Sequence, residues 1–136
     1  MACPFFEPQY VARDPKHVSA RVPLIEEYDG VCHASSELRA IPEELRFRCC
    51  NHGYSQGCCP SFPRNEARSS VRYHVVRQHA GELDVMLVEE QNFAPLRWRS
   101  IKYHSTGELI EPLLDDVCLR AQLIAFCRSY LRRFAD

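Results

Sequence analysis

Residues 49–60 decide how the first half of this chain folds, and they read Cys-Cys-Asn-His-Gly-Tyr-Ser-Gln-Gly-Cys-Cys-Pro. Two further cysteines, Cys3 and Cys32, precede this stretch. Residues 1–63 also carry seven of the nine prolines in the chain and show little helix or strand periodicity. The sequence therefore predicts an irregular, cysteine-rich lobe with little apolar core, which needs a staple in order to fold.

Residues 64–136 carry regular patterns instead. Apolar and polar residues alternate from Ser70 onward, and a turn at His79-Ala80-Gly81 precedes a second apolar run over residues 83–88. Residues 96–103 continue the alternation less cleanly. This part of the sequence predicts a three-stranded antiparallel sheet.

Two helices are expected. Residues 112–134 form the longer one, because acidic residues come early and arginines late, as the helix dipole favours. Residues 42–49 form a short one that delivers a cysteine pair to its site. The long helix has two apolar stripes, of which one comprises Val117, Ala121, Ile124, Cys127 and Leu131 and the other Leu119, Leu123, Phe126 and Tyr130. Since one small sheet would leave part of this wide face uncovered, we expect a protein partner or a larger complex.

The predicted fold class is therefore α+β. It comprises an irregular cysteine-rich lobe at residues 1–63, then a three-stranded antiparallel sheet and a long C-terminal helix at residues 64–136. The two parts are expected to form one compact unit, since 136 residues suit a single domain.

Composition argues against several classes of function. The 17 basic and 18 acidic residues leave a formal net charge of −1, so no basic field attracts nucleic acid or an anionic membrane. No apolar run approaches the roughly 18 residues of a membrane span, and the start of the chain lacks a signal-peptide pattern. We therefore expect a cytoplasmic protein. In a reducing cytoplasm, eight cysteines indicate metal binding or redox chemistry rather than disulfides.

Four cysteines form the predicted ligand set of a 4Fe-4S cluster, which is ordinarily held by four soft thiolates. Cys3 and Cys59 each precede a proline, as does the final ligand of the bacterial ferredoxin run. Cys32 follows Gly30, and Cys50 opens a segment that contains Gly53. Glycines near a ligand let the backbone approach a metal closely. The predicted function is electron transfer or redox sensing by a cluster at these four thiols.

Alternatives stay open at this point. The tandem pairs make Cys49 and Cys58 alternate ligands to their neighbours. Zinc is the rival metal, and His33 and His52 lie beside cysteines, although the paired knuckles that zinc favours are absent. Such a site would staple an interaction module without redox activity. A metal-free thiol protein, or one with disulfides, is the third alternative.

The two remaining cysteines, Cys118 and Cys127, are expected to be buried core thiols. They lie nine residues apart on the long helix, which is half a turn out of register. They therefore cannot share a bond or an ion.

One resemblance rests on several short segments. These are Arg-Val-Pro-Leu at 21–24, Tyr-Asp-Gly-Val-Cys-His-Ala at 28–34, Cys-Asn-His-Gly-Tyr at 50–54, Cys-Cys-Pro at 58–60 and Phe-Pro at 62–63. Together they resemble a set of small uncharacterised bacterial proteins that begin with a Cys-Pro-Phe-Phe type start. The resemblance covers residues 1 to about 63. It implies that the cysteine lobe is a recurring module, and it brings no catalytic residues with it.

No catalytic constellation is visible in the sequence. The later histidines fall on or beside expected strands and turns, and no phosphate-binding glycine loop or dinucleotide fingerprint is present. The basic aromatic stretch at residues 97–103 is interpreted as a solvated strand face rather than a nucleic-acid surface. The sequence thus favours a protein that is not an enzyme, without settling the question.

Overall fold

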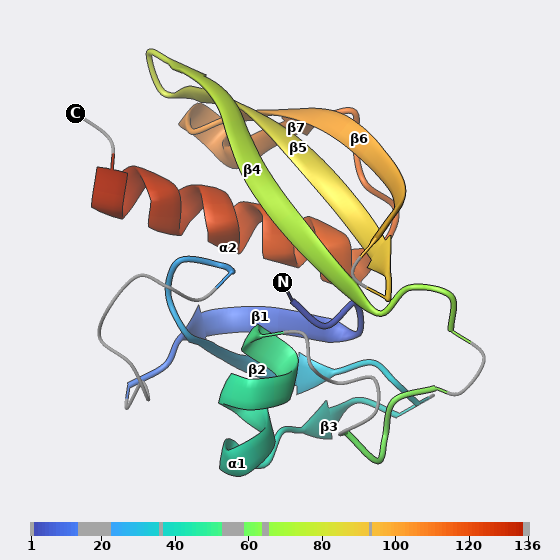
Figure 1. The fold of residues 1–136 in the computed structure, drawn as a ribbon. Helices are drawn as coiled ribbons and strands as arrows, with labels where there is room; N and C mark the ends of the chain where they lie inside the picture. The colour runs from blue at the N-terminus through green and yellow to red at the C-terminus, as the bar shows by residue number, and fades with distance from the viewer. Residues whose placement is uncertain are drawn as a thin grey trace.

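The computed structural model describes residues 2–13, 23–35, 37–52, 59–63, 66–92 and 94–134. Its strands form two antiparallel sheets, ordered β1-β2-β3 and β4-β5-β6-β7 (Figure 1). In chain order the elements are β1 (Phe6–Val11), β2 (Tyr28–Cys32), β3 (Arg39–Ala40), α1 (Glu43–Leu45), η1 (Arg46–Asn51), β4 (Ser70–His79), β5 (Glu82–Gln91), β6 (Ala94–His104), η2 (Thr106–Glu108), β7 (Leu109–Glu111) and α2 (Val117–Phe134).

The expectation of a single three-stranded sheet is wrong. The three strands expected after Ser70 are present as β4, β5 and β6, but β7 adds a fourth by pairing with residues 102–104. The lobe at residues 1–63 is not irregular either, because β1, β2 and β3 form a sheet of their own. Sequence patterns missed these strands because β3 and β7 have only two and three residues, too few for an alternation to register.

The hairpin of β4 and β5 begins the larger sheet, with β4 at its edge. Ala80 and Gly81 connect the strands with φ of 46° and 82°, as a two-residue type I′ turn requires. The register sets Tyr73 opposite Leu87 and Val75 opposite Val85, so their side chains share one face. That face is lined by buried side chains, among them Val71, Tyr73, Leu83, Val85, Leu87, Ile101 and Tyr103.

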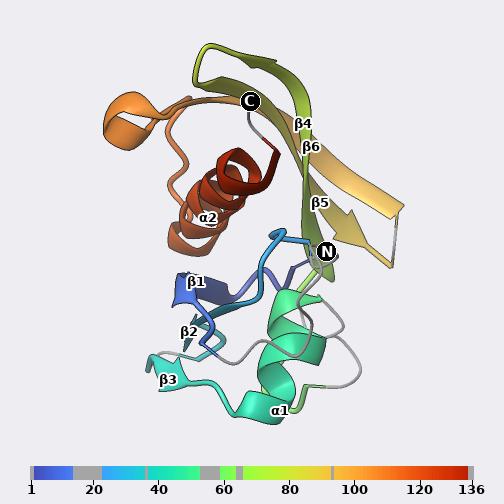
Figure 2. The same cartoon turned by 90° about the vertical axis from the view of Figure 1, so that its left-hand side faces the viewer.

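Helix α2 lies between the two sheets, as both views of the fold show (Figures 1 and 2). It begins at Val117 rather than at the expected position 112. The reason is Asp116, whose Oδ1 accepts hydrogen bonds from the peptide N–H groups of Cys118 and Leu119 at 2.9 and 3.1 Å. This is N-cap geometry, so Asp116 precedes the helix instead of belonging to its first turn.

The second sheet changes the interpretation of the helix. Phe126 stacks on Tyr73 of β4 with ring centroids 5.6 Å apart, while Ser129 on the other side accepts or donates a 2.6 Å hydrogen bond with the Tyr28 hydroxyl of β2. Both sheets therefore contact α2. The stripe of Leu119, Leu123, Phe126 and Tyr130 is buried or half-buried, whereas Val117 of the other stripe is 43% exposed and Gln122, which belongs to neither stripe, is buried. The expectation of a protein partner stays a prediction. No helix in the described parts of the chain is long and apolar enough to cross a membrane.

Candidate metal centre

Cys3 and Cys59 each open a tight turn of the same kind. The peptide N–H of Phe6 donates to the carbonyl of Cys3 at 3.1 Å, and that of Phe62 donates to the carbonyl of Cys59 at 3.1 Å. Both turns have the sequence Cys-Pro-x-Phe. Proline at the second position of a β-turn fixes φ near its required value, so the sequence itself shapes both turns.

Aromatic contact holds these two turns together. The rings of Phe5, in the first turn, and Phe62, in the second, meet edge to face with centroids 5.6 Å apart. The guanidinium of Arg68 lies 5.6 Å from the centroid of the Phe5 ring. Such contacts contribute about 1 kcal/mol each beyond burial. Cysteines far apart in the sequence are thereby held on neighbouring turns.

Cys32 is the last residue of β2 and pairs in register with Phe6 of β1. The peptide N–H of Ala34 donates to its Sγ at 3.4 Å. The nearby Gly30 serves β1 rather than a metal, which corrects the expectation from sequence. A Cβ at position 30 would stand 2.0 Å from the carbonyl oxygen of Glu7, so no larger residue fits between the strands.

Cys50 lies on η1, a π-helix, which is a form often found at functional sites. The expected short helix over residues 42–49 is thus present as α1 followed by η1. Asn51 fixes η1 against β2: its Oδ1 accepts from the Tyr28 N–H at 2.8 Å, and its Nδ2 donates to the carbonyls of Tyr28 and Arg46 at 2.9 and 2.8 Å. The Asn51 side chain thereby satisfies both peptide groups of Tyr28 inside the protein, where unpaired groups would be costly.

These segments converge on one cavity of about 260 Å³. Cys32, Cys50 and Cys59 line it together with apolar residues such as Ile41 and Leu45. Cys3 joins them through its peptide N–H, which donates to the carbonyl of Cys50 at 3.0 Å. All four cysteines expected as ligands are therefore assembled in one place, from four separate segments.

The thiols influence one another electrostatically. Burial raises the pKa of Cys50 far above its ordinary value, and the nearby Cys3, Cys32, Cys59 and Cys49 raise it further. Several thiolates at this place would repel one another in a medium of low dielectric. A bound cation would offset this repulsion and favour the thiolate forms, because a thiol that coordinates a cation is deprotonated.

The spacing of the thiols bears on what they could hold. Among the described residues, no three Cys, His, Asp or Glu side chains form a group that could hold a single metal ion. Zinc–sulfur bonds of about 2.3 Å in a tetrahedral site would bring the sulfurs to within about 3.8 Å of one another. Three of the described thiols, those of Cys32, Cys50 and Cys59, line the cavity of about 260 Å³ instead.

The alternate ligands take other positions. Cys58 lies outside the described residues. Cys49 is buried next to Cys50 and, like the two histidines, is not among the residues that line the cavity. The Nε2 of His33 forms a 2.6 Å hydrogen bond with the Glu7 carboxylate, and the ring of His52 lies against Phe47 at 4.5 Å. Both histidines therefore contact other side chains, and neither contact supports a mixed Cys/His zinc site.

Cys118 and Cys127 are both buried, which confirms that they are core thiols. Cys118 is nevertheless close to the site, on the side of α2. Burial raises its pKa to about 12, with further contributions from Asp116, Glu7, Cys3 and Cys32. The sequence placed Cys118 on the long helix but could not show which sheet it would face.

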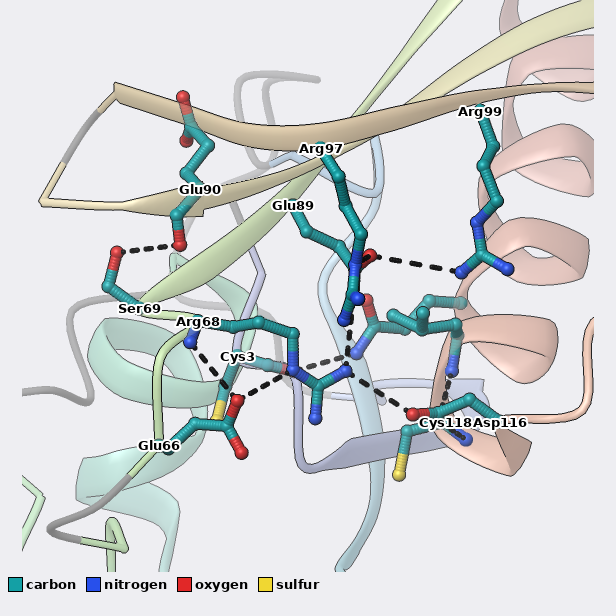
Figure 3. A network of polar contacts seen from close by, with 12 residues as sticks. Cys3, Glu66, Arg68, Ser69, Glu89, Glu90, Arg97, Arg99, Asp116 and Cys118 are labelled. Carbon is teal, nitrogen blue, oxygen red and sulfur yellow. Dashed lines mark hydrogen bonds and ion pairs between the residues drawn. The ribbon is translucent and has the colours of Figure 1, made fainter.

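A buried ionic network lies between the cysteine turns and the start of α2 (Figure 3). Arg68 donates to Glu66, Glu89 and Asp116 at 2.9, 3.2 and 3.3 Å. Glu89 is 1% exposed and also binds Arg97 of β6. The interpretation of residues 97–103 as a solvated strand face agrees with the exposure of Trp98 and Arg97 on β6, which are 64% and 61% exposed. Glu89 lies on the neighbouring β5, and its charge is paired inside the protein.

Comparisons with models of protein families, with curated proteins and with solved structures find no match. The functional argument therefore depends on the geometry above. Of the four predicted ligands, Cys32, Cys50 and Cys59 line the cavity, and that the four cysteines bind a metal stays a prediction. Sequence reasoning missed the residues that hold these segments in place. One signal was available, the repeated Cys-Pro-x-Phe, whereas nothing in the sequence marks Asn51 as a clamp.

Proposed function

We propose that this protein holds one 4Fe-4S cluster through Cys3, Cys32, Cys50 and Cys59 and uses it for electron transfer or redox sensing in the cytoplasm. The observation that carries the proposal is the shared cavity, which three of these thiols line and to which a backbone hydrogen bond ties the fourth. Four thiolates are the usual ligand set of such a cluster.

The size of the cavity and the contacts of the two histidines support a cluster over zinc. A polynuclear cluster is several times wider than a single ion, so its ligands stand around it rather than closing on one point. The cavity of about 260 Å³ suits that arrangement, and no described group is compact enough for one ion. The histidines that a mixed zinc site would use are directed to Glu7 and Phe47 instead.

The surroundings of the cavity suit redox chemistry. Cys32 and Cys59 are only half-buried, so one edge of a bound cluster would lie near the surface, where electrons can be exchanged with a partner protein. The rim at that side includes Ile41, Pro42 and Leu45. The N–H···S bond to Cys32 would stabilise added negative charge, which is one of the ways in which proteins set a cluster potential.

Anaerobic purification followed by metal analysis tests the proposal. We expect a broad visible band near about 400 nm, with about four irons and about four acid-labile sulfides per chain. Cys50→Ser should lose this band and most of the iron. Cys127→Ala is the matched control, because it also replaces a buried thiol but lies on α2 away from the cavity lining.

The outcomes separate the alternatives. Colourless protein that contains about one zinc per chain would reject the cluster and support the zinc-stapled interaction module. Protein without metal after anaerobic reconstitution with iron and sulfide would reject both metals. Equal iron content in Cys50→Ser and Cys127→Ala would remove Cys50 from the ligand set.

A further inference from the structure

Gln122 is a buried polar residue in the middle of α2, with no exposed surface. It belongs to a row of Cys118, Gln122, Ala125 and Ser129, spaced so that all four lie on one face of the helix. The side chains of this row are small or polar, so a search for apolar stripes in the sequence does not detect it. A long amide at its centre is therefore surrounded by shorter side chains.

The side-chain amide of Gln122 forms three hydrogen bonds, each with a different partner. Its Nε2 donates to the carbonyls of Cys3 and Phe6 at 2.7 and 2.8 Å. Its Oε1 accepts from the Tyr73 hydroxyl at 2.9 Å. The partners fix the orientation of the amide, since the flipped form would set its oxygen against two carbonyl oxygens. Gln122 thus joins β4 to both ends of the first cysteine turn.

This connection matters because it joins the turn that carries Cys3 to the long helix, in addition to the backbone contacts of that turn. One tie is the backbone pairing of Ala2 with Val71. Two more are the peptide N–H groups of Cys3 and His33, which donate to the carbonyls of Cys50 and Phe5 at 3.0 and 2.8 Å. Gln122 adds a side-chain tie from α2, because it binds the carbonyls at both ends of the Cys3-to-Phe6 turn.

We infer that Gln122 is a positioning residue for Cys3, holding the turn at the angle that directs this thiol to the other three. The role of Cys3 as a ligand rests on the proposed function, whereas the positioning of Cys3 by Gln122 rests on the hydrogen bonds described above. It assigns helix α2 a role in the site, although the helix supplies none of the four proposed ligands. Ligand position then depends on the packing of α2 between the sheets.

The test uses the full chain in its metal-free, reduced form, so that it does not depend on the metal. The alkylation rate of each cysteine by iodoacetamide is followed by mass spectrometry. Gln122→Met keeps the volume but removes both donors, and Gln122→Glu keeps the acceptor for Tyr73 while replacing the amide donors. Because two buried hydrogen bonds are lost, we expect Cys3 to react at least about tenfold faster in both variants, with Cys127 unchanged.

Two control variants exclude a general loosening. Tyr73→Phe removes a hydrogen bond of the same amide but leaves both bonds to the cysteine turn. Ser129→Ala removes another buried polar contact on the same face of α2. Neither should accelerate alkylation of Cys3. If either does so as strongly as Gln122→Met, or if Gln122→Met leaves the Cys3 rate unchanged, the inference is wrong.

A second readout applies to the iron-loaded protein. Gln122→Met should shift the reduction potential or the electron paramagnetic resonance spectrum of the cluster, and it should speed the loss of iron to a chelator. Tyr73→Phe should change none of these. An unchanged spectrum and iron-loss rate would contradict the positioning role. A wild-type protein that binds no iron would reject the proposed function alone, because the alkylation result would still decide the role of Gln122.

Discussion

The two sheets of this protein are stabilised in different ways. The β4-β5-β6-β7 sheet packs on α2 through apolar side chains such as Leu83, Leu87, Leu119 and Leu123, each at most 1% exposed. Burying each of these contributes about 2 kcal/mol. The β1-β2-β3 sheet buries some apolar residues too, but its interior contacts include the Arg46–Glu27 ion pair and the Asn51 amide.

The difference indicates what each region needs. A buried ion pair stabilises little, because the cost of removing both charges from water offsets most of their attraction. The polar contacts of the smaller sheet therefore specify its fold more than they stabilise it, whereas the buried Phe6, Leu24 and Tyr28 of the same region belong to the apolar core. In this comparison the larger sheet and α2 serve as the scaffold, and we expect a bound metal to add stability to the N-terminal region.

The largest effect is expected for Cys32→Ser. Since metal binding to such a region is also folding free energy, on the order of 10 kcal/mol for structural sites, losing one thiolate should release the metal. Limited proteolysis should then cut faster within residues 1–63 than in the metal-loaded wild type and leave residues 70–134 protected.

Leu113→Ala is the matched control, because Leu113 is 67% exposed and should change neither metal content nor the cleavage pattern. Two results would contradict the comparison. Full metal content in Cys32→Ser would show that Cys32 is not a ligand, and uniform cleavage along the chain would show that the two regions do not differ.

Leu123→Ala tests the other region. Leu123 has no exposed surface and belongs to the apolar core around α2, so its truncation should lower the free energy of unfolding by about 3 kcal/mol. Urea unfolding followed by circular dichroism gives this value. The folded variant should retain the metal spectrum of the wild type, and a changed spectrum at full folding would show that the core of the larger sheet governs the site directly.

The same contrast explains what could be read from the sequence. The larger sheet was predictable because Val71, Tyr73 and Val75 alternate and Ala80-Gly81 suits a tight turn. These are local signals, and the structure bears out three strands and the long helix. Strand β7 escaped notice because three residues carry no period, and its place is set by pairing with β6.

The N-terminal region was less predictable for a physical reason. Its contacts join residues far apart in the chain, such as Asn51 with Tyr28 and Gln122 with Cys3, and they are hydrogen bonds rather than apolar stripes. No periodicity announces such contacts. The cysteines could be singled out by their residue type alone, whereas the sheet that carries them could not be predicted, and their role as metal ligands stays a prediction.

The smallest expected effect is a loss of stability at low pH, which involves the half-buried carboxylates of Glu26 and Glu66. Burial alone would raise the pKa of Glu26, but hydrogen bonds from Ser129 and Arg132 outweigh it and lower the pKa below the usual 4.5. Glu66 behaves alike, with burial opposed and exceeded by hydrogen bonds and charge from Arg68, so that its pKa is also lowered. Both carboxylates are thus more acidic in the folded protein than in the unfolded chain.

The sign of the effect follows from linkage. A lowered folded pKa contributes stability that is present above the unfolded value of about 4.5 and is lost as pH falls through the folded value. We expect a loss of about 1 kcal/mol or less for each carboxylate between about pH 6 and about pH 3, measured by urea unfolding of metal-free protein so that thiol protonation at a metal does not contribute. The Glu26→Gln and Glu66→Gln double variant should have the shallower pH dependence. If its slope equals that of the wild type, these ion pairs do not couple the two regions, and the packing of α2 between the sheets must hold them together by itself.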